Sequence, residues 1–448
     1  MYFKKYIKNK EENSKSKQPE LIKKVESYLS RLLIKFQHQM DKRYSYTFFD
    51  LIMGILSFRD RINGLLLSEL GGYVNGPKHA PAGTKRISNF LRKANWESSD
   101  IGEELYQQCK DRMMEPKESG RWWLMTWDDS VLEKPESWFS EGLCPVRSSK
   151  AGRLTRIKRG YYRPPLKGQI CVPGYQWSAG VLTALGQTPQ IFQMEWWTTR
   201  GRHKEHPKNA FYRMLHQAAR LQKETQATLW HVLDRGYANA TTLDWMLELK
   251  QQFIIRWKSN QLLYNQQGVL KNTYKHSLGQ KVMRYEKVWD KERKQHRNIG
   301  IIYRKVAHPD FPNQPLYLII IRAKRKGQSP MYLLTNIKID SIGMAKAILF
   351  AYIKRWDIEQ TFRFGKTAMA MEAPRLWRFE NRIKLLMIVT LAFSFLLQFF
   401  RKYKQDARKI INTWCPRTGK WQDRVALPLY RLRLAICQLI LYDIIPKT

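Results

Sequence analysis

Cysteine is scarce and scattered in this chain of 448 residues. The count is odd and no two positions have the Cys-x-x-Cys spacing, with the residues at Cys109, Cys144, Cys171, Cys415 and Cys437. Such a distribution argues against a disulfide framework and against a zinc ribbon. We therefore expect free cysteines in a reducing compartment.

Segments that could direct the chain to a membrane are equally scarce. The amino terminus lacks the apolar run of a secretory signal, which favours a cytoplasmic, nucleoid-associated protein. One long apolar run, Leu385–Phe400, would reach only ~24 Å as a helix, short of the ~30 Å hydrocarbon core. It predicts a buried core helix and no membrane partner.

Acidic residues are few relative to basic ones. The chain has 38 Asp and Glu against 79 Lys and Arg, giving a net charge of +41. So large an excess indicates a polyanionic partner, and nucleic acid is the first candidate. A hydrophobic content of 43% with 16 tryptophans excludes a disordered basic tail.

The order of apolar patterns predicts an α/β core between helical ends. Residues 1–118 read as a helical domain, with an apolar stretch, Leu51–Leu70, broken at Gly71-Gly72, and a basic helix pair suited to holding DNA ends. A plain helical bundle explains that pair equally well. Residues 119–260 read as the first part of the core, in which three strands are followed by two helices that alternate with two more strands. The five strands are expected at Trp122–Trp127, Trp177–Leu182, Gln190–Trp197, Thr228–Leu233 and Phe253–Trp257.

The remainder of the chain divides into three parts. Residues 261–339 read as a basic, β-rich insertion, with strands expected at Leu316–Ile321 and Met331–Thr335. A long helix is expected from Ser341 through Lys366, inside a segment of 340–385 that returns to the core. Residues 386–448 read as helical.

Three carboxylates are candidates for catalysis. Asp128 and Asp234 each follow an apolar strand pattern, and Glu359 lies on the expected long helix. Ligands in α/β proteins bind at the carboxyl ends of strands. Phosphodiester cleavage with two Mg²⁺ ions needs hard oxygen ligands that converge from separate elements. The three carboxylates meet that requirement, and adjacent Asp129 remains an alternative to Asp128.

The expected helix around Glu359 carries a more specific pattern. Tyr352, Arg355, Glu359 and Lys366 have offsets of 0, 3, 7 and 14, which place them within an arc of about 60° on a helix. A surface ion pair would explain Arg355 and Glu359 alone, but not why Tyr352 and Lys366 align with them.

This pattern resembles the Tyr-x2-Arg-x3-Glu-x6-Lys signature of DDE transposases of the insertion-sequence-four type. Asp234-Arg235-Gly236-Tyr237 is similar to the family's second aspartate motif, and the segment from Trp127 to Glu133 to the first, with Asp-x-Ser spacing that favours Asp128. The resemblance covers residues 120 to 385. It implies an RNase H-like core interrupted by a β-rich insertion.

The resemblance also implies an activity. Family members use Mg²⁺, for which Mn²⁺ can substitute, to nick transposon ends and join the freed 3′ hydroxyl to target DNA. Asp128, Asp234 and Glu359 would bind the metal, while Tyr352, Arg355 and Lys366 would contact DNA. We expect a homodimer in a synaptic complex. A metal-dependent nuclease without strand transfer, or a domesticated DNA-binding protein without catalysis, are the alternatives.

Two further features are expected to contact DNA. Residues 147–167 contain no acid, and the basic residues expected to meet phosphates are Arg147, Lys150, Arg153, Arg156, Lys158 and Arg159. A solvated loop is the simpler interpretation. In the insertion, Trp289 could stack a base flipped beside the cut, as in some family members. Alternatively, Trp289 packs against a small β-sheet.

Overall fold

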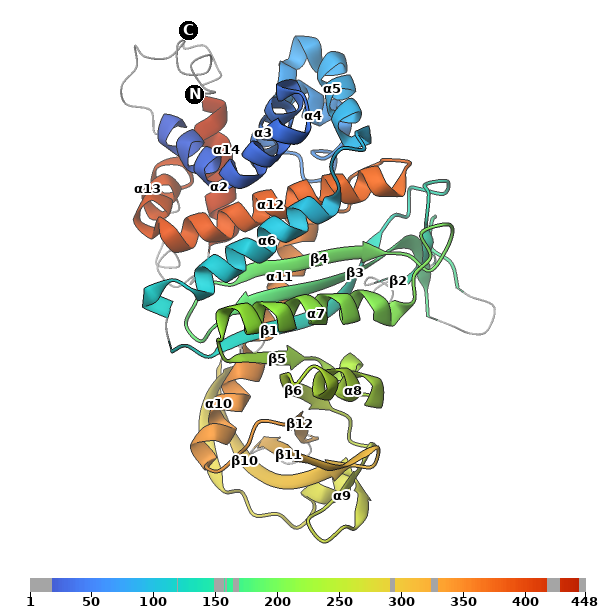
Figure 1. The fold of residues 1–448 in the computed structure, drawn as a ribbon, viewed down its shortest axis with the longest axis vertical. Helices are drawn as coiled ribbons and strands as arrows, with labels where there is room; N and C mark the ends of the chain where they lie inside the picture. Colours follow the sequence, from blue (N-terminus) through green and yellow to red (C-terminus); the bar gives the residue numbers. More distant parts are fainter. Residues whose placement is uncertain are drawn as a thin grey trace.

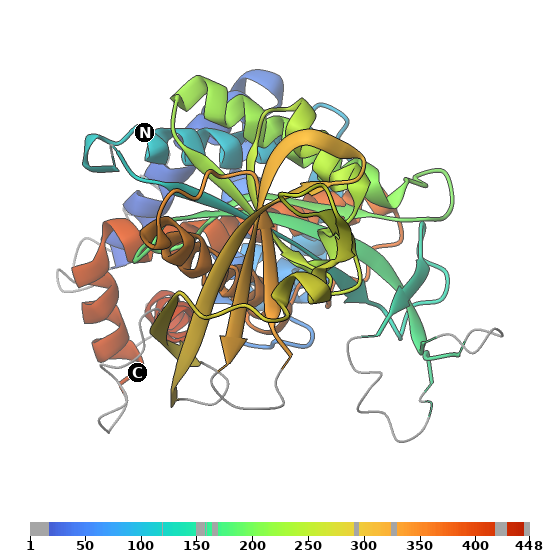
Figure 2. The same ribbon diagram turned by 90° about the horizontal axis from the view of Figure 1, so that it is seen from below.

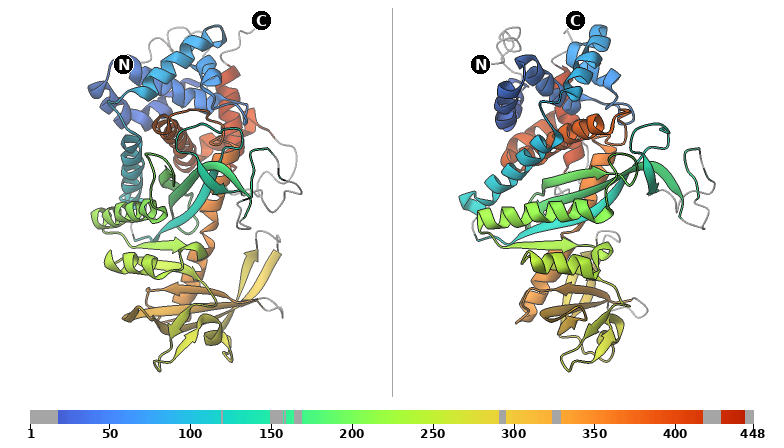
Figure 3. Two further views of the ribbon diagram at one scale, coloured as in Figure 1. Left: turned by 90° about the vertical axis from the view of Figure 1, so that its right-hand side faces the viewer. Right: turned by 45° about the vertical axis from the view of Figure 1, so that its right-hand side comes forward.

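The computed structural model describes residues 18–118, 120–148, 157, 159–163, 169–290, 295–323, 329–416 and 428–442. The protein is elongated, with three tiers: a helical tier containing both described ends of the chain, a central sheet, and a β-rich tier at the far end (Figures 1 and 3). All five cysteines are free, which confirms the prediction from their spacing.

The helical tier begins with five helices: α2 (Gln18–Gln39), α3 (Lys42–Ser57), α4 (Leu67–Asn75), α5 (Ala80–Arg92) and α6 (Ser98–Met113). The prediction that Gly71-Gly72 breaks a helix was wrong, because both residues lie inside α4. A Cβ atom on Gly71 would lie 2.4 Å from the carbonyl oxygen of Ala80, and one on Gly83 would lie 2.2 Å from that of Gly71. The glycines therefore allow α4 and α5 to cross in backbone contact.

The central sheet has the strand order of an RNase H-like fold. An antiparallel meander comprises β1 (Trp123–Glu133), β3 (Cys171–Thr183) and β4 (Gln190–Trp197), with the short β2 (Cys144–Arg147) also paired to β3. Then β5 (Leu229–Leu233) pairs in parallel with β1, and β6 (Gln252–Trp257) with β5. The connecting helices are α7 (Pro207–Thr225) and α8 (Ala240–Glu248). All five predicted strands are confirmed.

The residues expected to form an insertion continue this sheet. The strand order runs from β6 through β12 (Met331–Thr335), β11 (Phe311–Ala323) and β10 (Gln295–His308). The shorter elements are β7 (Leu262–Tyr264), β8 (Leu270–Asn272), α9 (Thr273–Ser277) and β9 (Arg284–Asp290), which pairs with β10. Figure 2 views the molecule from this end, with the yellow and orange strands nearest the viewer.

The single long helix expected from Ser341 through Lys366 is instead two helices. α10 (Ile342–Ile353) and α11 (Trp356–Thr367) meet at Lys354 and Arg355. Around the junction, the amides of Arg355 and Ile358 bond carbonyls three residues back, as in a 3₁₀ turn. A salt bridge of 2.7 Å between Lys354 and Asp357 spans the junction. The helix therefore turns just before the residue that carries the third carboxylate.

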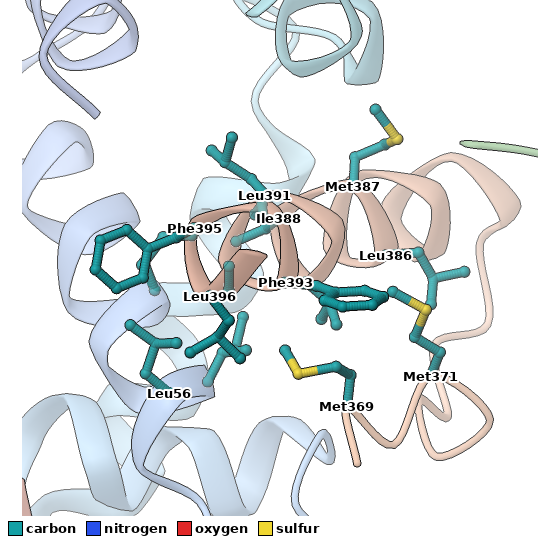
Figure 4. Packing of buried hydrophobic residues seen from close by; sticks show 14 of the residues in the cluster. Leu56, Met369, Met371, Leu386, Met387, Ile388, Leu391, Phe393, Phe395 and Leu396 are labelled. Atoms are coloured by element: carbon teal, nitrogen blue, oxygen red, sulfur yellow. The ribbon is translucent and has the colours of Figure 1, made fainter. Parts of the chain in front are cut away.

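The apolar run forms the axis of the main hydrophobic core. It lies in α12 (Phe379–Lys402), which is long and apolar enough to cross a membrane. However, 83% of its most apolar 18-residue stretch is buried inside the protein. Figure 4 shows Phe393, Leu396 and Leu386 of α12 packed against neighbouring segments. The last described helices are α13 (Lys404–Trp414) and α14 (Leu429–Tyr442). This arrangement matches the predicted core helix.

Candidate functional site

The first two candidate carboxylates lie side by side on neighbouring parallel strands. Trp127 of β1 pairs with Leu233 of β5, so Asp128 and Asp234 occupy the next position on each chain. The prediction that Asp128 ends its strand was wrong, because β1 continues to Glu133 along β3. What ends at Asp128 is the pairing with β5, and this opens the sheet where the two carboxylates meet.

Asp234 is held by the turn that follows β5. Its carboxylate accepts a hydrogen bond from the amide of Gly236, in a 3₁₀ turn over Arg235–Tyr237. A Cβ atom on Gly236 would lie only 2.9 Å from the Asp234 Oδ1 atom. Glycine at this position therefore lets the backbone close around the carboxylate.

The third carboxylate is positioned by the packing of α11 on the sheet. Glu359 lies in the first turn of α11, whose buried face includes Phe362 and Gly365. The Phe362 ring stands edge-on to Trp177 of β3 with centroids 4.7 Å apart. A Cβ atom on Gly365 would lie 2.8 Å from the Trp177 ring. The fully buried Trp177 thus sets how closely α11, and with it Glu359, approaches β1.

Arg355 joins the first and third carboxylates. Its Nη1 atom lies 3.1 Å from Asp128 Oδ2, and its Nη2 atom donates a hydrogen bond to Glu359 Oε1. The side chains of Arg355, Asp128 and Glu359 are 15%, 18% and 30% exposed. The site is therefore a partly desolvated cluster in which Arg355 bridges Asp128 and Glu359 and Asp234 lies beside Asp128 on the neighbouring strand.

Asp128 carries the clearest electrostatic perturbation in this cluster. Burial and the negative charge of Asp234 raise the pKa of Asp128 to about 7, although Arg355 opposes the shift. A cation that approached Asp128 and Asp234 would relieve both causes. The donor set consists of hard carboxylate oxygens, the ligands that Mg²⁺ and Mn²⁺ prefer.

These residues fit a divalent cation in charge and donor type, but they are not preassembled around one. Within the described parts of the chain, no three His, Cys, Asp or Glu side chains already stand close enough to hold a metal ion. Arg355 lies between Asp128 and Glu359 and holds them apart from a common centre. Metal binding at this site would therefore require Arg355 to release at least one carboxylate.

The neighbouring Asp129 has different partners. Its carboxylate accepts a hydrogen bond of 2.6 Å from the Ser178 hydroxyl and another from Tyr237. Ser178 in turn accepts a hydrogen bond from the Trp197 indole. Asp129 is thus tied to β3 and to the turn after β5, while Asp128 faces Asp234 and Arg355.

The other two residues of the helix pattern lie on either side of this cluster. Tyr352 is 7% exposed, and its ring lies 5.9 Å from the Arg355 guanidinium carbon. Within the described part of the chain, its buried hydroxyl has no hydrogen-bond partner of good geometry. Lys366, near the end of α11, lies 3.9 Å from Glu372. The structure therefore groups Tyr352, Arg355 and Glu359 closely, with Lys366 two turns further along.

The residues expected to contact DNA outside the helix are only partly described. Arg147 at the end of β2 and Arg159 are exposed, whereas Lys150, Arg153, Arg156 and Lys158 lie outside the described residues. Trp289 is 49% exposed on β9 and meets His296 of β10 with ring centroids 5.1 Å apart. Trp289 thus contacts a neighbouring strand while leaving half of its surface to solvent.

A buried polar chain behind the carboxylates was not predicted from the sequence. The Trp127 indole donates to His231 Nδ1 at 2.9 Å, and His231 Nε2 lies 3.0 Å from Gln251 Oε1. These partners require a neutral imidazole with its proton on Nε2. Burial lowers the pKa of His231 to about 4, which keeps it neutral. Trp127 directly precedes Asp128, and His231 lies three residues before Asp234 in the same apolar run, which is the only signal in the sequence.

Comparison with known proteins adds one match. A family model described as the transposase DDE domain matches residues 198–395. No curated protein matches the chain. The matched segment contains Asp234, Arg355 and Glu359 but begins after β4, so Asp128 enters the site through the structure alone. The match, together with the mixed α/β fold, supports a DDE transposase.

Proposed function

We propose that the protein is a DNA transposase of the insertion-sequence-four type. It would hydrolyse DNA at transposon ends and join the resulting 3′ hydroxyl to target DNA. The observation that carries the proposal is the convergence of three carboxylates from two sheet strands and a helix, with Arg355 between Asp128 and Glu359 and with Asp234 beside Asp128. The match to a transposase DDE domain and the charge of +41 support it independently.

In this proposal, Asp128, Asp234 and Glu359 hold the divalent cations. Bound Mg²⁺ would supply a Lewis acid for the scissile phosphate and lower the pKa of an attacking water. The protein's contribution is the scaffold of β1, β5 and α11, which brings the three carboxylates into one region, from which Arg355 would release at least one of them when cations bind. Asp129 is assigned a supporting role, because Ser178 and Tyr237 already occupy its oxygens.

Arg355 has a proposed double role. Without cations, its guanidinium offsets the repulsion among the carboxylates. When bound cations neutralise the carboxylates instead, the guanidinium is free to contact a phosphate near the scissile bond. Tyr352 would follow Arg355, since its buried hydroxyl makes no hydrogen bond of good geometry among the described residues, and Lys366 would contact the same DNA strand. Arg355→Ala should therefore weaken binding to a cut DNA end without lowering Mn²⁺ affinity.

DNA is the proposed partner, and the protein is expected to act as a homodimer in a synaptic complex in the cytoplasm. Residues 1–118 are proposed to hold the DNA ends, and the exposed Arg147 and Arg159 to contact phosphates. Log affinity should fall by ~0.9 per phosphate neutralised for each tenfold rise in salt. Replacing Arg147 and Arg159 with Ser should flatten that slope, and an unchanged slope would contradict their assignment.

The decisive experiment uses the inverted repeats that flank the gene as substrate. Purified protein with Mg²⁺ should nick at the repeat ends and join a 3′ hydroxyl end to a target plasmid. Nicking without any joined product would favour a nuclease, and end binding without nicking in either Mg²⁺ or Mn²⁺ would favour a DNA-binding protein without catalysis.

A further inference from the structure

A polar cavity lies in the helical tier, among α2, α6 and α12, which pack together in Figure 1. Its volume is about 230 Å³, against a share of about 30 Å³ for one water molecule in the liquid. The cavity is lined by eight charged side chains, namely Lys24, Arg31, Glu104, Asp111, Arg112, Glu115, Arg401 and Lys402. It has room for a small ion together with several waters.

The acids of this cavity are already paired. Arg31 bonds both Glu104 and Asp111, at 2.9 and 2.6 Å. Arg401 holds Glu115 through two parallel hydrogen bonds of 2.9 and 3.0 Å. The negative charges that face the cavity are therefore engaged by Arg31 and Arg401.

Arg112 is the exception on the positive side. The residue is 1% exposed, and among the described residues none of its three guanidinium nitrogens has a hydrogen-bond partner. Its guanidinium carbon lies 5.2 Å from the centre of the Trp123 ring. Contact with an aromatic face cannot satisfy the N–H groups, which lie in the plane of the guanidinium. A buried cation with unsatisfied donors is costly unless an anion completes it.

Lys402 is the second lining cation that lacks an ion-pair partner. It is exposed at the edge of the cavity and makes no ion pair within the described part of the chain. Burial and neighbouring Arg401 lower the pKa of Arg112 to about 10, and the same causes lower the pKa of Lys402. Glu115 opposes both shifts without cancelling them. Arg112 and Lys402 are therefore the lining cations that form no ion pair within the described residues, and an anion would supply the missing partner.

We propose that this cavity binds a phosphate group, with Arg112 at its base and Lys402 at its edge. A phosphate group carries a charge of about −1.5 to −2 at neutral pH and offers several strong acceptor oxygens. The planar fork of an arginine suits those oxygens. The cavity is separate from the carboxylate cluster and is not required by the proposed DNA cleavage. The phosphate could be a free anion or belong to a DNA backbone.

The test is to titrate the full chain with inorganic phosphate and to measure binding by calorimetry. The unfolding temperature in phosphate is then compared with that in chloride at the same ionic strength. Phosphate should bind saturably and raise the unfolding temperature beyond the chloride control. Arg112→Gln should raise the dissociation constant at least about tenfold, since it removes charge-assisted hydrogen bonds. It should also unfold at a temperature no lower than wild type in chloride, because an uncompensated charge is gone.

A second variant covers the case in which Arg112→Gln fails to fold. Lys402→Gln changes an exposed side chain and should weaken phosphate binding about threefold or more, in line with one peripheral charge contact. Lys404→Gln is the matched control, because Lys404 is also exposed but does not line this cavity. It should leave phosphate binding unchanged.

Competition identifies the source of the phosphate group. Displacement of inorganic phosphate by duplex DNA would assign the site to the DNA backbone, and simultaneous binding would assign it to a free anion. Either result supports the site. The proposal would be overturned if phosphate and chloride had equal effects, or if phosphate binding survived both Arg112→Gln and Lys402→Gln. Either outcome would show that the cavity holds water and no specific anion.

Discussion

The core around α12 and the carboxylate cluster are built on opposite principles. The α12 core is almost entirely apolar, and Leu386, Ile388 and Leu396 have no exposed surface. The carboxylate cluster instead gathers three acids in a partly desolvated site, at an electrostatic cost that Asp128 shows in its raised pKa. The first region stabilises the fold, whereas the second carries an electrostatic cost that the proposed binding of cations would explain.

The two regions are nonetheless joined mechanically. Phe362 of α11 and Trp177 of β3 belong to the same continuous apolar cluster as α12, together with Met369 and Met371 from the segment after α11. Figure 4 shows Met369 and Met371 packed beside Phe393 and Leu386. The helix that carries Glu359 is therefore positioned by side chains of the core.

The largest effect should come from the carboxylates. Asp128→Asn, Asp234→Asn and Glu359→Gln should each lower DNA cleavage by roughly 10³-fold or more, the scale seen when a group essential to the transition state is removed. Asp128→Asn should not lower the unfolding temperature, because it relieves the repulsion between Asp128 and Asp234. Cleavage assays on flanking inverted repeats and thermal unfolding measure the two effects. Asp244→Asn, in an exposed position on α8, is the control and should cleave normally.

The core should show the reverse response. Leu396→Ala removes a fully buried side chain and should lower the free energy of unfolding by about 2–5 kcal/mol. Arg408→Ala, at an exposed position on α13, should change it by no more than about 0.5 kcal/mol. Denaturant unfolding measures both. A carboxylate variant as destabilised as Leu396→Ala would erase the contrast between the regions.

Acid should destabilise the protein through His231. In the unfolded chain, His231 takes up a proton near pH 6.5, whereas its pKa in the fold is lowered to about 4. Its contribution to stability is therefore present above about pH 6.5 and is lost progressively as the pH falls towards 4, by up to about 3 kcal/mol. His231→Gln should reduce the slope of stability against pH in that window. An unchanged slope would mean that His231 is not held neutral.

The contact between α11 and the apolar core can be disturbed by a substitution at Gly365. A Cβ atom there would lie 2.8 Å from the Trp177 ring, so Gly365→Ala should cost about 1–3 kcal/mol and should also reduce cleavage by displacing Glu359. Gly343→Ala in α10 is the matched control, since its nearest neighbour would be Ser341 Oγ at an ordinary 3.6 Å. It should be neutral or stabilising. Equal loss in both variants would contradict a role for Trp177 in seating α11.

Trp289 is expected to contribute little to stability. With half of its surface exposed on β9, Trp289→Ala should shift the free energy of unfolding by less than about 1 kcal/mol. If it stacks a flipped base, the first nick should be spared and cleavage of the second strand impaired, with rescue by an abasic site at the flipped position. Equal loss of nicking and of thermal stability would identify a packing residue instead.

Sequence periodicity predicted the regular parts of the fold well, because strands of the core are short apolar runs bounded by polar turns. It also predicted that Asp128 and Asp234 each follow an apolar strand, which is where the structure has them. It could not show that β1 passes beyond Asp128, since pairing with β3 continues on the other side. Nor could it show that Gly71 and Gly83 allow a close helix crossing, because that contact depends on tertiary packing.

The break before α11 was hidden for a similar reason. The residues Lys354-Arg355 have ordinary helix propensity, and the spacing of Tyr352, Arg355, Glu359 and Lys366 suits one continuous helix. The turn is stabilised by contacts made in three dimensions, including the bond from Lys354 Nζ to the carbonyl of Gln187 at 3.2 Å. Likewise, that Arg355 would bridge Asp128 and Glu359 depends on where β1 lies relative to α11.

The central claim is that Asp128, Asp234 and Glu359, and not Asp129, hold the divalent cations. Titration of Mn²⁺ into the purified protein, followed by the electron paramagnetic resonance signal of free Mn²⁺, tests it without any DNA substrate. Asp128→Asn should lose Mn²⁺ affinity to the same extent as Asp234→Asn, while Asp129→Asn should retain it. Normal Mn²⁺ binding by Asp128→Asn together with its loss in Asp129→Asn would contradict the account.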